Sequence, residues 1–310
     1  MNARPLVVVL ILSYNGKSLL YDALTSYLSS EYSNLKIILI DNGSEDKTEE
    51  YVLKSFPLVE VLRLNKNKGY SGGFNAGILY AKNKYNPDYF LISNNDVFIH
   101  KNAISELVSV ALSSSEIGFV TGKVYYYNFK GRKDVLQTVG KEFSKNTLIP
   151  KNIGSGEIDR GQYDHIESLQ ACDDVYSLVS KGVIESTNGY DGNFFHEHEE
   201  TDWHFRSKKL GFKISFSSRS KLWHKLSVTT GGWLTPKIVF YSFRNQILIL
   251  KRHGTENQLL IFLMKLLFWR LPVNIFINFI KSRFNLLTAS FKGTLSGFKW
   301  IIEEDYEVIQ

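Results

Sequence analysis

The 310-residue sequence has one cysteine, Cys172, six prolines and no long uncharged apolar run. A single cysteine excludes an internal disulfide and suits a reducing compartment, so we expect a cytoplasmic protein. No stretch reaches the roughly 18 uncharged apolar residues that a membrane-spanning helix needs, so we expect no such helix. Lysine and arginine form no dense block, which argues against nucleic acid as a partner.

What is present indicates a folded α/β protein. Hydrophobic residues make up 44% of the chain, and the formal net charge is +6. The first 125 residues alternate segments of helical spacing with apolar runs at residues 6–12, 36–40, 59–64 and 89–93. The first run is too short for a signal peptide, so we expect it to be a strand. The alternation predicts a parallel sheet, and ligands bind beyond the carboxyl ends of parallel strands.

Two polar clusters at the expected strand ends can bind a nucleotide. Asp41 can accept a hydrogen bond from the ring N–H of uracil or thymine, or it can cap the next helix. The glycine-rich segment 65–77 has residues that can meet phosphate, approach a ligand closely or hydrogen-bond a nucleotide: Lys68, Gly72, Gly73 and Asn75. The same segment can instead be a loop before a tightly packed helix. It lacks the G-x-G-x-x-G spacing of dinucleotide-binding proteins.

A third cluster, Asn94-Asn95-Asp96, follows the fourth apolar run. Its oxygen ligands suit Mg²⁺ or Mn²⁺, and a diphosphate would complete the coordination. Because the cluster has one carboxylate, we expect metal to bind mainly together with a donor. The alternative is an asparagine-rich turn without metal.

A fourth cluster is acidic. Glu199, Glu200 and Asp202 precede a helical run, where negative charge is favourable in any case. Histidines and aromatic residues crowd the same segment, and a carboxylate in an apolar setting can have a raised pKa and act as a general base. The segment lacks the H-E-x-x-H spacing of zinc hydrolases. Further along, the lone His224 precedes hydroxyl-bearing residues and two glycines, a composition typical of a site loop.

In order, the segments LSYNG, DNGS, NKGYSGGFNAG, NND, EETD…R…GF and WH resemble the family-2 inverting glycosyltransferases, over residues 6–253. Within that family the chain looks most like bacterial rhamnosyltransferase-type members of cell-surface polysaccharide assembly. The resemblance implies the α/β GT-A fold, with a mainly parallel central sheet flanked by helices and a C-terminal helical appendage. We expect a catalytic domain at 1–235, with a nucleotide-sugar half (1–125) and an acceptor half (126–235), and a helical region at 236–310.

The resemblance also implies roles for individual residues. Those that would contact the nucleotide-sugar are Ser13, Tyr14, Asn15, Asp41, Lys68, Gly72, Gly73, Asn75 and Asn95. Asp96 matches the carboxylate of the family's D-x-D metal motif, Asn94 replaces the other acid, and His224 matches a position that ligates metal in some members. Glu199 and Glu200 match an acidic pair whose second member is the base, so we take Glu200 as the base.

We therefore predict a metal-dependent inverting glycosyltransferase that uses dTDP-rhamnose or a UDP-sugar and a glycan or lipid-linked acceptor. The alternatives are a nucleotidyltransferase, a sugar-nucleotide epimerase, or a non-catalytic nucleotide- or glycan-binding module. A nucleotidyltransferase usually has a glycine- and Arg/Lys-rich segment after its first strand, where this chain has SYNGK.

The segment 258–284 is strongly apolar but is interrupted by four cations and by Pro272, which we expect to end or kink a helix. Aromatic residues beside cations are typical of a helix that lies in the headgroup region of an anionic membrane. We therefore expect a peripheral association with the inner face of the plasma membrane. The alternative is a core helix or a homodimer interface, with the cations pointing outward.

Overall fold

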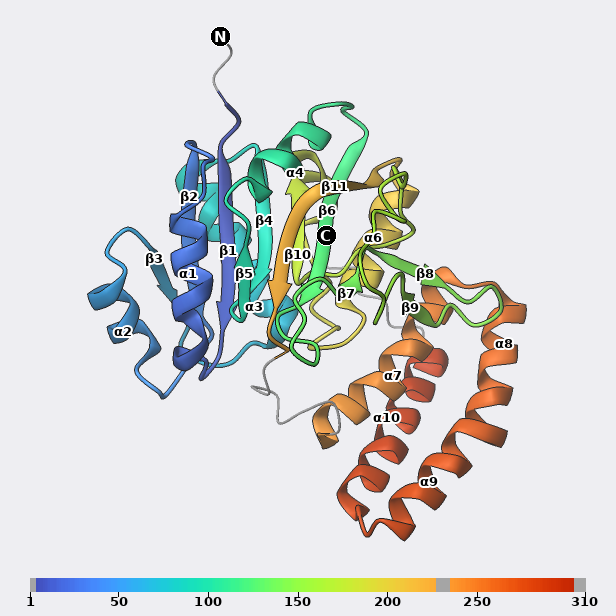
Figure 1. Ribbon diagram of the computed structural model, residues 1–310. Coiled ribbons are helices and arrows are strands. Elements are labelled where there is room, and N and C mark those ends of the chain that lie inside the picture. The colour runs from blue at the N-terminus through green and yellow to red at the C-terminus, as the bar shows by residue number, and fades with distance from the viewer. Residues whose placement is uncertain (1–3, 227–234, 304–310) are drawn as a thin grey trace.

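The computed structural model describes residues 4–226 and 235–303. Figure 1 shows a central sheet flanked by helices and a separate group of C-terminal helices, coloured orange to red, at one end of it. The order of the nine strands in the sheet is β3-β2-β1-β4-β10-β6-β11-β5, with β7 paired to β6. Their bounds are β1 (Val7–Ser13), β2 (Leu35–Asp41), β3 (Glu60–Arg63), β4 (Tyr89–Asn94), β5 (Val97–Ile99), β6 (Ile117–Tyr126), β7 (Leu136–Thr138), β10 (Tyr176–Ser180) and β11 (Lys213–His224).

The first four strands in sheet order are parallel, as the alternating sequence predicts. Val7, Val9 and Ile11 face α1 (Leu20–Leu28), α2 (Thr48–Ser55) and α4 (Ala103–Ala111). Val8 and Leu10 face α3 (Gly69–Tyr85), α5 (Lys181–Thr187) and α6 (Glu199–Lys209). These strands read as continuous apolar runs because both faces are buried.

The register of the parallel strands places their carboxyl ends side by side. Ser13 pairs with Asp41, Asp41 pairs with Arg63, and Leu12 pairs with Asn94. The polar residues that follow these strands therefore meet at one edge of the sheet.

The second half of the sheet is mixed rather than mainly parallel. Strand β10 runs antiparallel to both of its neighbours, and β5 runs antiparallel to β11. Antiparallel strands need no helical crossover, so the strand–helix alternation that identifies the first half is missing here. The polar segment after residue 126 forms β7 and the hairpin of β8 (Lys141–Phe143) and β9 (Pro150–Asn152), as its weak periodicity indicates.

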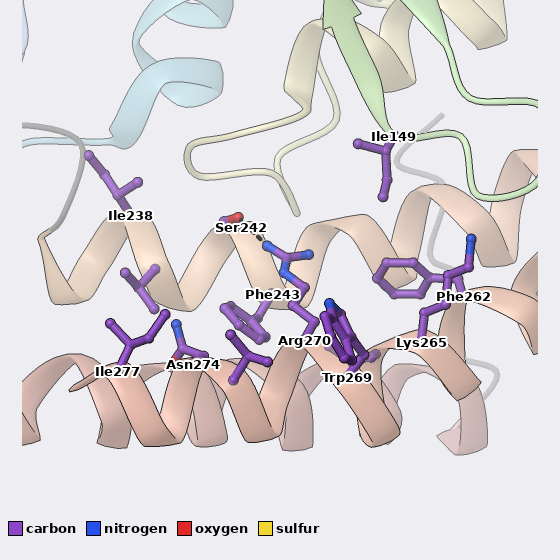
Figure 2. A pocket seen from close by; sticks show the side chains of 13 residues that line it. Ile149, Ile238, Ser242, Phe243, Phe262, Lys265, Trp269, Arg270, Asn274 and Ile277 are labelled. Atoms are coloured by element: carbon purple, nitrogen blue, oxygen red, sulfur yellow. Dashed lines mark hydrogen bonds between the residues drawn. The ribbon is translucent and has the colours of Figure 1, made fainter. Parts of the chain in front are cut away.

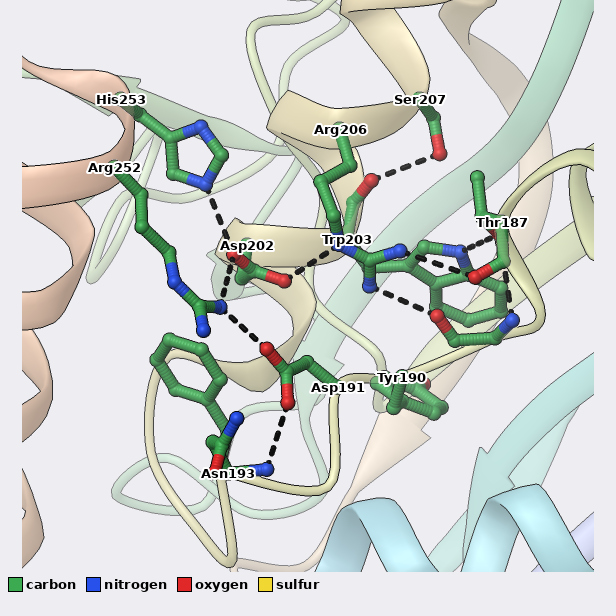
Figure 3. A network of polar contacts seen from close by, with 12 residues as sticks. Thr187, Tyr190, Asp191, Asn193, Asp202, Trp203, Arg206, Ser207, Arg252 and His253 are labelled. Atoms are coloured by element: carbon green, nitrogen blue, oxygen red, sulfur yellow. Dashed lines mark hydrogen bonds and ion pairs between the residues drawn. The ribbon is translucent and has the colours of Figure 1, made fainter. Parts of the chain in front are cut away.

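A buried carboxylate joins α6 to α7 (Pro236–His253), as Figure 3 shows. Asp202 accepts hydrogen bonds from Arg206 and His253 and pairs with Arg252. Arg252 also pairs with Asp191, in the loop before α6. Burial opposes ionisation of Asp202, but the hydrogen bond from His253 and the arginine charges outweigh burial and lower its pKa. The first C-terminal helix is therefore fixed to the sheet domain by charge as well as by packing.

The remaining helices are α8 (Glu256–Lys265), a π-helical stretch (Leu266–Arg270), α9 (Leu271–Ile280) and α10 (Phe284–Glu303). Pro272 does not end the helix, because it lies in the first turn of α9 and follows the π-helical stretch, whose wider turn accommodates a residue without an N–H. By length and composition, the continuous helix Glu256–Ile280 can cross a membrane, which the search for uncharged runs did not predict. Only 17% of its most apolar window is buried.

Candidate active site

A cavity of about 640 Å³ opens at the carboxyl ends of β1, β4 and β11. It collects most of the residues that the sequence singles out as metal ligands or acids. Its lining includes Tyr14, Asn94, Asn95, Asp96, Glu199, Glu200 and His224. Thr235, Lys237 and Ile238, at the start of α7, close the side next to the C-terminal helices.

One end of the cavity has the geometry of a metal site. The Nε2 atom of His224 lies 3.1 Å from Oδ1 of Asp96. The other ring nitrogen, Nδ1, lies 2.9 Å from Oε1 of Gln137. If Nδ1 donates to that oxygen, Nε2 is the nitrogen that can ligate a metal beside Asp96. A carboxylate and an imidazole are both ligands that a divalent metal accepts, so a divalent metal would fit Asp96 and His224.

The asparagines beside Asp96 are partly engaged by the protein. Asn95 donates to Ser13 Oγ, and Asn94 Oδ1 lies 3.5 Å from the hydroxyl of Tyr70. Ser13 is thus buried behind Asn95 rather than in the lining. Asn15 has a left-handed backbone (φ 50°) and accepts from the amide of Glu45, so its side chain holds the loop.

The other predicted nucleotide contacts do not line the cavity. Asp41 is fully buried, and its two carboxylate oxygens accept from the amide of Ser44 and from Arg63. Asn75 bonds the backbone N–H and carbonyl of Tyr190. Lys68, Gly72 and Gly73 belong to the start of α3, where Gly73 packs against Leu12 and Asn42. The segment is therefore, at least in part, the tightly packed helix start that the sequence leaves as its alternative.

Another part of the cavity lining is acidic, with five carboxyl groups: Asp173, Asp174, Glu197, Glu199 and Glu200. Lys141, on β8, reaches into this cluster. Its Nζ atom lies 2.5 Å from Glu200 Oε1 and 3.5 Å from Asp173 Oδ2. No sequence motif marks Lys141, Asp173 or Asp174, because they come from the irregular segments before β10.

The surroundings shift the pKa values of the neighbouring Glu199 and Glu200 in opposite directions. Burial would raise the pKa of Glu200, but the charge and hydrogen bond of Lys141 outweigh burial and lower it, so Glu200 is ionised at neutral pH. Burial and the charge of Glu200 raise the pKa of Glu199, whose Oε2 has no hydrogen-bond partner among the described residues. Carboxyl groups whose pKa values are pushed apart in this way are typical of acid–base sites.

The backbone in front of α6 is strained and is held from two sides. Glu197 and His198 both have left-handed φ angles, 69° and 68°, which cost free energy for residues other than glycine. Asn245, on α7, donates to the carbonyls of His196 and Glu197 at 2.8 and 2.7 Å. Ser71, on α3, donates to the carbonyl of Phe194. The glycine-rich segment and α7 together therefore set the direction of Glu199 and Glu200.

Cys172 is buried behind the acidic end, and its sulfur lies 3.4 Å from Ser177 Oγ and from His204 Nε2. Cys172, Asp174 and His204 form a group in which the atoms that could ligate a metal lie within 4.8 Å of one another. Burial raises the pKa of the Cys172 thiol and of the Asp174 carboxyl, and it lowers the pKa of His204 to about 3. Burial therefore disfavours the charged form of all three groups, and the thiol is a poor nucleophile.

The sheet, the cavity and its two chemically distinct ends agree with a comparison against known families. Residues 8–163 match the family described as glycosyl transferase family 2. The chain belongs to glycosyltransferase family 2. This membership separates it from the nucleotidyltransferase and epimerase alternatives. The hydroxyl-bearing residues after His224 lie outside the described residues.

Curated relatives include the poly-beta-1,6-N-acetyl-D-glucosamine synthases of two staphylococci. The Staphylococcus epidermidis protein is 24% identical over 242 residues, which cover 77% of this chain and 55% of the relative. The Staphylococcus aureus (strain COL) protein is 23% identical over 248 residues, with 78% and 55% coverage. The chain spans about half the length of the curated relatives it matches.

Solved structures with the same fold include three transferases. GalNAc-T7, solved with UDP, GalNAc and Mn²⁺, gives a TM-score of 0.61 at 16% identity, covering 78% of this chain and 48% of that one. S. aureus TarS 1–349 in complex with UDP-GlcNAc gives 0.59 at 12%, covering 92% and 79%. The mannosyltransferase PcManGT from Pyrobaculum calidifontis, with GDP-Man and Mn²⁺, gives 0.57 at 11%, covering 99% and 78%. These similarities confirm the GT-A fold.

Replacing Lys141 with methionine should destabilise the protein in a pH-dependent way. Loss of the ammonium leaves Glu200 charged and buried, which typically costs about 3–5 kcal/mol. In the variant the pKa of Glu200 rises, so acid neutralises the glutamate and relieves part of this cost. The wild-type contribution of Glu200, whose folded pKa is lowered, stays constant above its unfolded pKa of about 4.3 and is lost only below it. The stability gap, measured by urea unfolding, should therefore be larger at pH 7.5 than at pH 5.

The matched control is Lys151→Met, on the neighbouring strand β9, because Lys151 is 78% exposed in its pair with Glu142. This control should leave the unfolding midpoint unchanged at both pH values. A gap of equal size at pH 5 and pH 7.5 for Lys141→Met would show that Lys141 acts only through packing.

Proposed function

We propose that this family-2 protein is an inverting, metal-dependent glycosyltransferase that moves a sugar from a nucleoside-diphosphate sugar to a glycan or lipid-linked acceptor of a cell-surface polysaccharide. The main support for this proposal is that one cavity is lined both by Glu200, which pairs with Lys141, and by the neighbouring Asp96 and His224. UDP and UDP-GlcNAc complexes among the fold neighbours, and polysaccharide synthases among the relatives, favour a UDP-sugar. dTDP-rhamnose stays a candidate donor from the sequence resemblance.

In this proposal the donor lies between the two ends of the cavity. The nucleobase contacts Tyr14, and Asp41 acts from behind it by holding Arg63 and the backbone of Ser44. Asp96 and His224, with Asn94 and Asn95 beside them, face the diphosphate. Mg²⁺ or Mn²⁺ bound there supplies positive charge that offsets the charge on the leaving diphosphate.

Glu200 then takes the proton of an acceptor hydroxyl while that oxygen bonds to the anomeric carbon and the bond to the diphosphate breaks. One displacement inverts the anomeric configuration. The raised pKa of Glu199 favours its protonated form, and the lowered pKa of Glu200 makes Glu200 the ionised base of the pair. Lys141 keeps Glu200 ionised, and Asp173, 3.5 Å from the ammonium, is a second partner for Lys141 when the acceptor approaches.

Release of nucleoside diphosphate from a panel of nucleotide-sugars should identify a donor, and Glu200→Gln should abolish its use. We expect a loss of about 10²–10⁴-fold in turnover, because a neutral amide cannot take the proton. Donor binding should persist, since the base acts on the acceptor. Glu199→Gln is the matched control: the raised pKa of Glu199 disfavours its charged form, so a neutral amide changes less there and turnover should fall far less. Near-normal turnover by Glu200→Gln would refute the assignment, and a panel without any release would favour a binding module.

Asp96→Ala should uncouple metal from nucleotide binding. In the wild-type protein we expect Mn²⁺ to tighten the binding of UDP, measured by calorimetry, because both contact Asp96. The variant should lose most of this enhancement, and His224→Ala should lose less. Asp134→Ala, which removes an exposed acid paired with Arg132, should keep it. An unchanged Mn²⁺ effect in Asp96→Ala would move the metal elsewhere.

We also propose that the outer face of the helix Glu256–Ile280 lies on the cytoplasmic membrane surface. Phe268 and Trp269 are 71% and 72% exposed, and Phe276 and Phe279 lie exposed further along the same helix. Its other face packs against α7 and α10 through Phe262, Leu266 and Leu271. A helix with one face on protein and one apolar face outward suits a surface position.

The wild-type protein should therefore sediment with anionic vesicles at low salt and detach at high salt. Replacing Phe268, Phe276 and Phe279 with glutamine should abolish sedimentation, because the apolar face is lost. Leu58→Gln, at an exposed leucine outside the helical region, should change nothing. Resistance of the bound protein to high salt would indicate a spanning helix, and recovery of the wild type in the supernatant would leave only the packing explanation.

A further inference from the structure

A second cavity, of about 760 Å³, lies between α7 and the helix Glu256–Ile280 (Figure 2). Its walls are apolar, from Ile149 on the β8–β9 hairpin, Val239 and Phe243 on α7, and Phe262, Val273 and Ile277 on the opposite helix. Val273 and Ile277 are also part of the exposed apolar face of that helix. We call this cavity the interhelical groove.

The groove adjoins the candidate active-site cavity at Ile238, which lines both. The two cavities also lie close enough for their charges to interact. Burial lowers the pKa of His198, in the catalytic cavity, to about 4, and the charge of Arg270, in the groove, adds to this shift. A molecule in the groove therefore lies next to the cavity that holds the acidic residues, with Ile238 between them.

Two cations, Arg270 and Lys265, line the groove, and Arg270 is the one that lies against Phe243. Figure 2 shows its guanidinium in the middle of the groove, where it donates to Ser242 Oγ at 3.1 Å and stacks on Phe243 at 4.3 Å. In the described ranges no carboxylate pairs with it. One turn along, the Oδ1 atom of Asn274 is buried without a hydrogen-bond partner among these residues. A cation between apolar walls is complementary to an anion that carries an apolar chain.

We propose that the interhelical groove binds a phosphorylated single-chain lipid that serves as the acceptor, with its phosphate on Arg270, its chain along Phe262 and Val273, and its hydroxyl-bearing head past Ile238 in the catalytic cavity. This inference rests on the proposed function and names the class of acceptor for it. The exposed apolar face beside the groove gives such a lipid a direct route from a membrane.

Calorimetry on the full chain tests the groove with alkyl phosphates below their micelle-forming concentration. From hexyl to octyl to decyl phosphate, affinity should rise by roughly threefold to fourfold for each methylene that enters the groove. Decanol and inorganic phosphate should each bind at least about tenfold more weakly than decyl phosphate, since each lacks one half of the recognition. A flat chain-length series, or decanol binding as tightly as decyl phosphate, would overturn the proposal.

Variants assign the binding to these residues. Arg270→Gln should weaken decyl phosphate about tenfold or more and leave decanol unchanged, with Arg270→Lys intermediate as a check on folding. Val273→Trp should weaken both ligands by filling the groove. Lys281→Gln removes a cation of the same segment that does not line the groove, and it should change neither. Unaltered decyl phosphate binding in both Arg270→Gln and Val273→Trp would refute the site.

Two further readouts separate this proposal from its alternatives. Nucleoside diphosphate release to water, measured without acceptor, reports the proposed function alone, and Lys281→Gln should retain it. If the wild type releases no nucleoside diphosphate but binds decyl phosphate as described, the transferase assignment fails and the lipid site stands. If light scattering shows a dimer that Val273→Trp dissociates, and decyl phosphate does not bind, the groove is an interface between two copies and the proposal fails.

Discussion

The catalytic cavity depends on one ammonium group among several carboxyl groups. Lys141 contacts Glu200 and Asp173, and Asp174, Glu197 and Glu199 lie around them. Buried charges of one sign cannot all remain ionised, so the cluster divides into groups that hold a proton and groups that do not. Lys141 decides this division in favour of Glu200. The lysine thereby keeps Glu200, the base of the proposed mechanism, ionised at neutral pH, and it pairs with Asp173 as well.

The helical region is part of the active site rather than an addition to it. Asn245 on α7 holds the left-handed turn at Glu197 and His198, and Asp202 ties α6 to Arg252 and His253. A boundary at residue 235 marks the change from mixed α/β structure to helices. It does not separate two independent functions, because α7 both lines the catalytic cavity and fixes the acidic turn.

Sequence reasoning succeeds where a residue's position along a strand determines its place in the fold. Asn94, Asn95 and Asp96 end up in the cavity because the carboxyl ends of parallel strands meet at one edge. Sequence reasoning is less informative where a polar residue can either contact a ligand or hold the fold. Asp41 and Asn75 are polar residues beside the site, yet their side chains bond Arg63 and Tyr190. Lys141 carries no signal at all, because the irregular segment that delivers it has no periodicity from which its partners can be inferred.

The C-terminal helix shows a related limit, this time in the backbone. Pro272 and the cations at 265 and 270 suggest a broken, partly polar segment, whereas the structure has a continuous helix with a π-helical stretch before the proline. That stretch spans residues 266–270, so the local change in helical pitch includes Arg270, which points towards α7 rather than outwards to water. Lys265 and Arg270 both line the groove, whereas Lys281 does not. Phe268, Phe276 and Phe279 lie exposed outside the groove, so one helix presents a cavity with two cations on one side and an apolar face on the other.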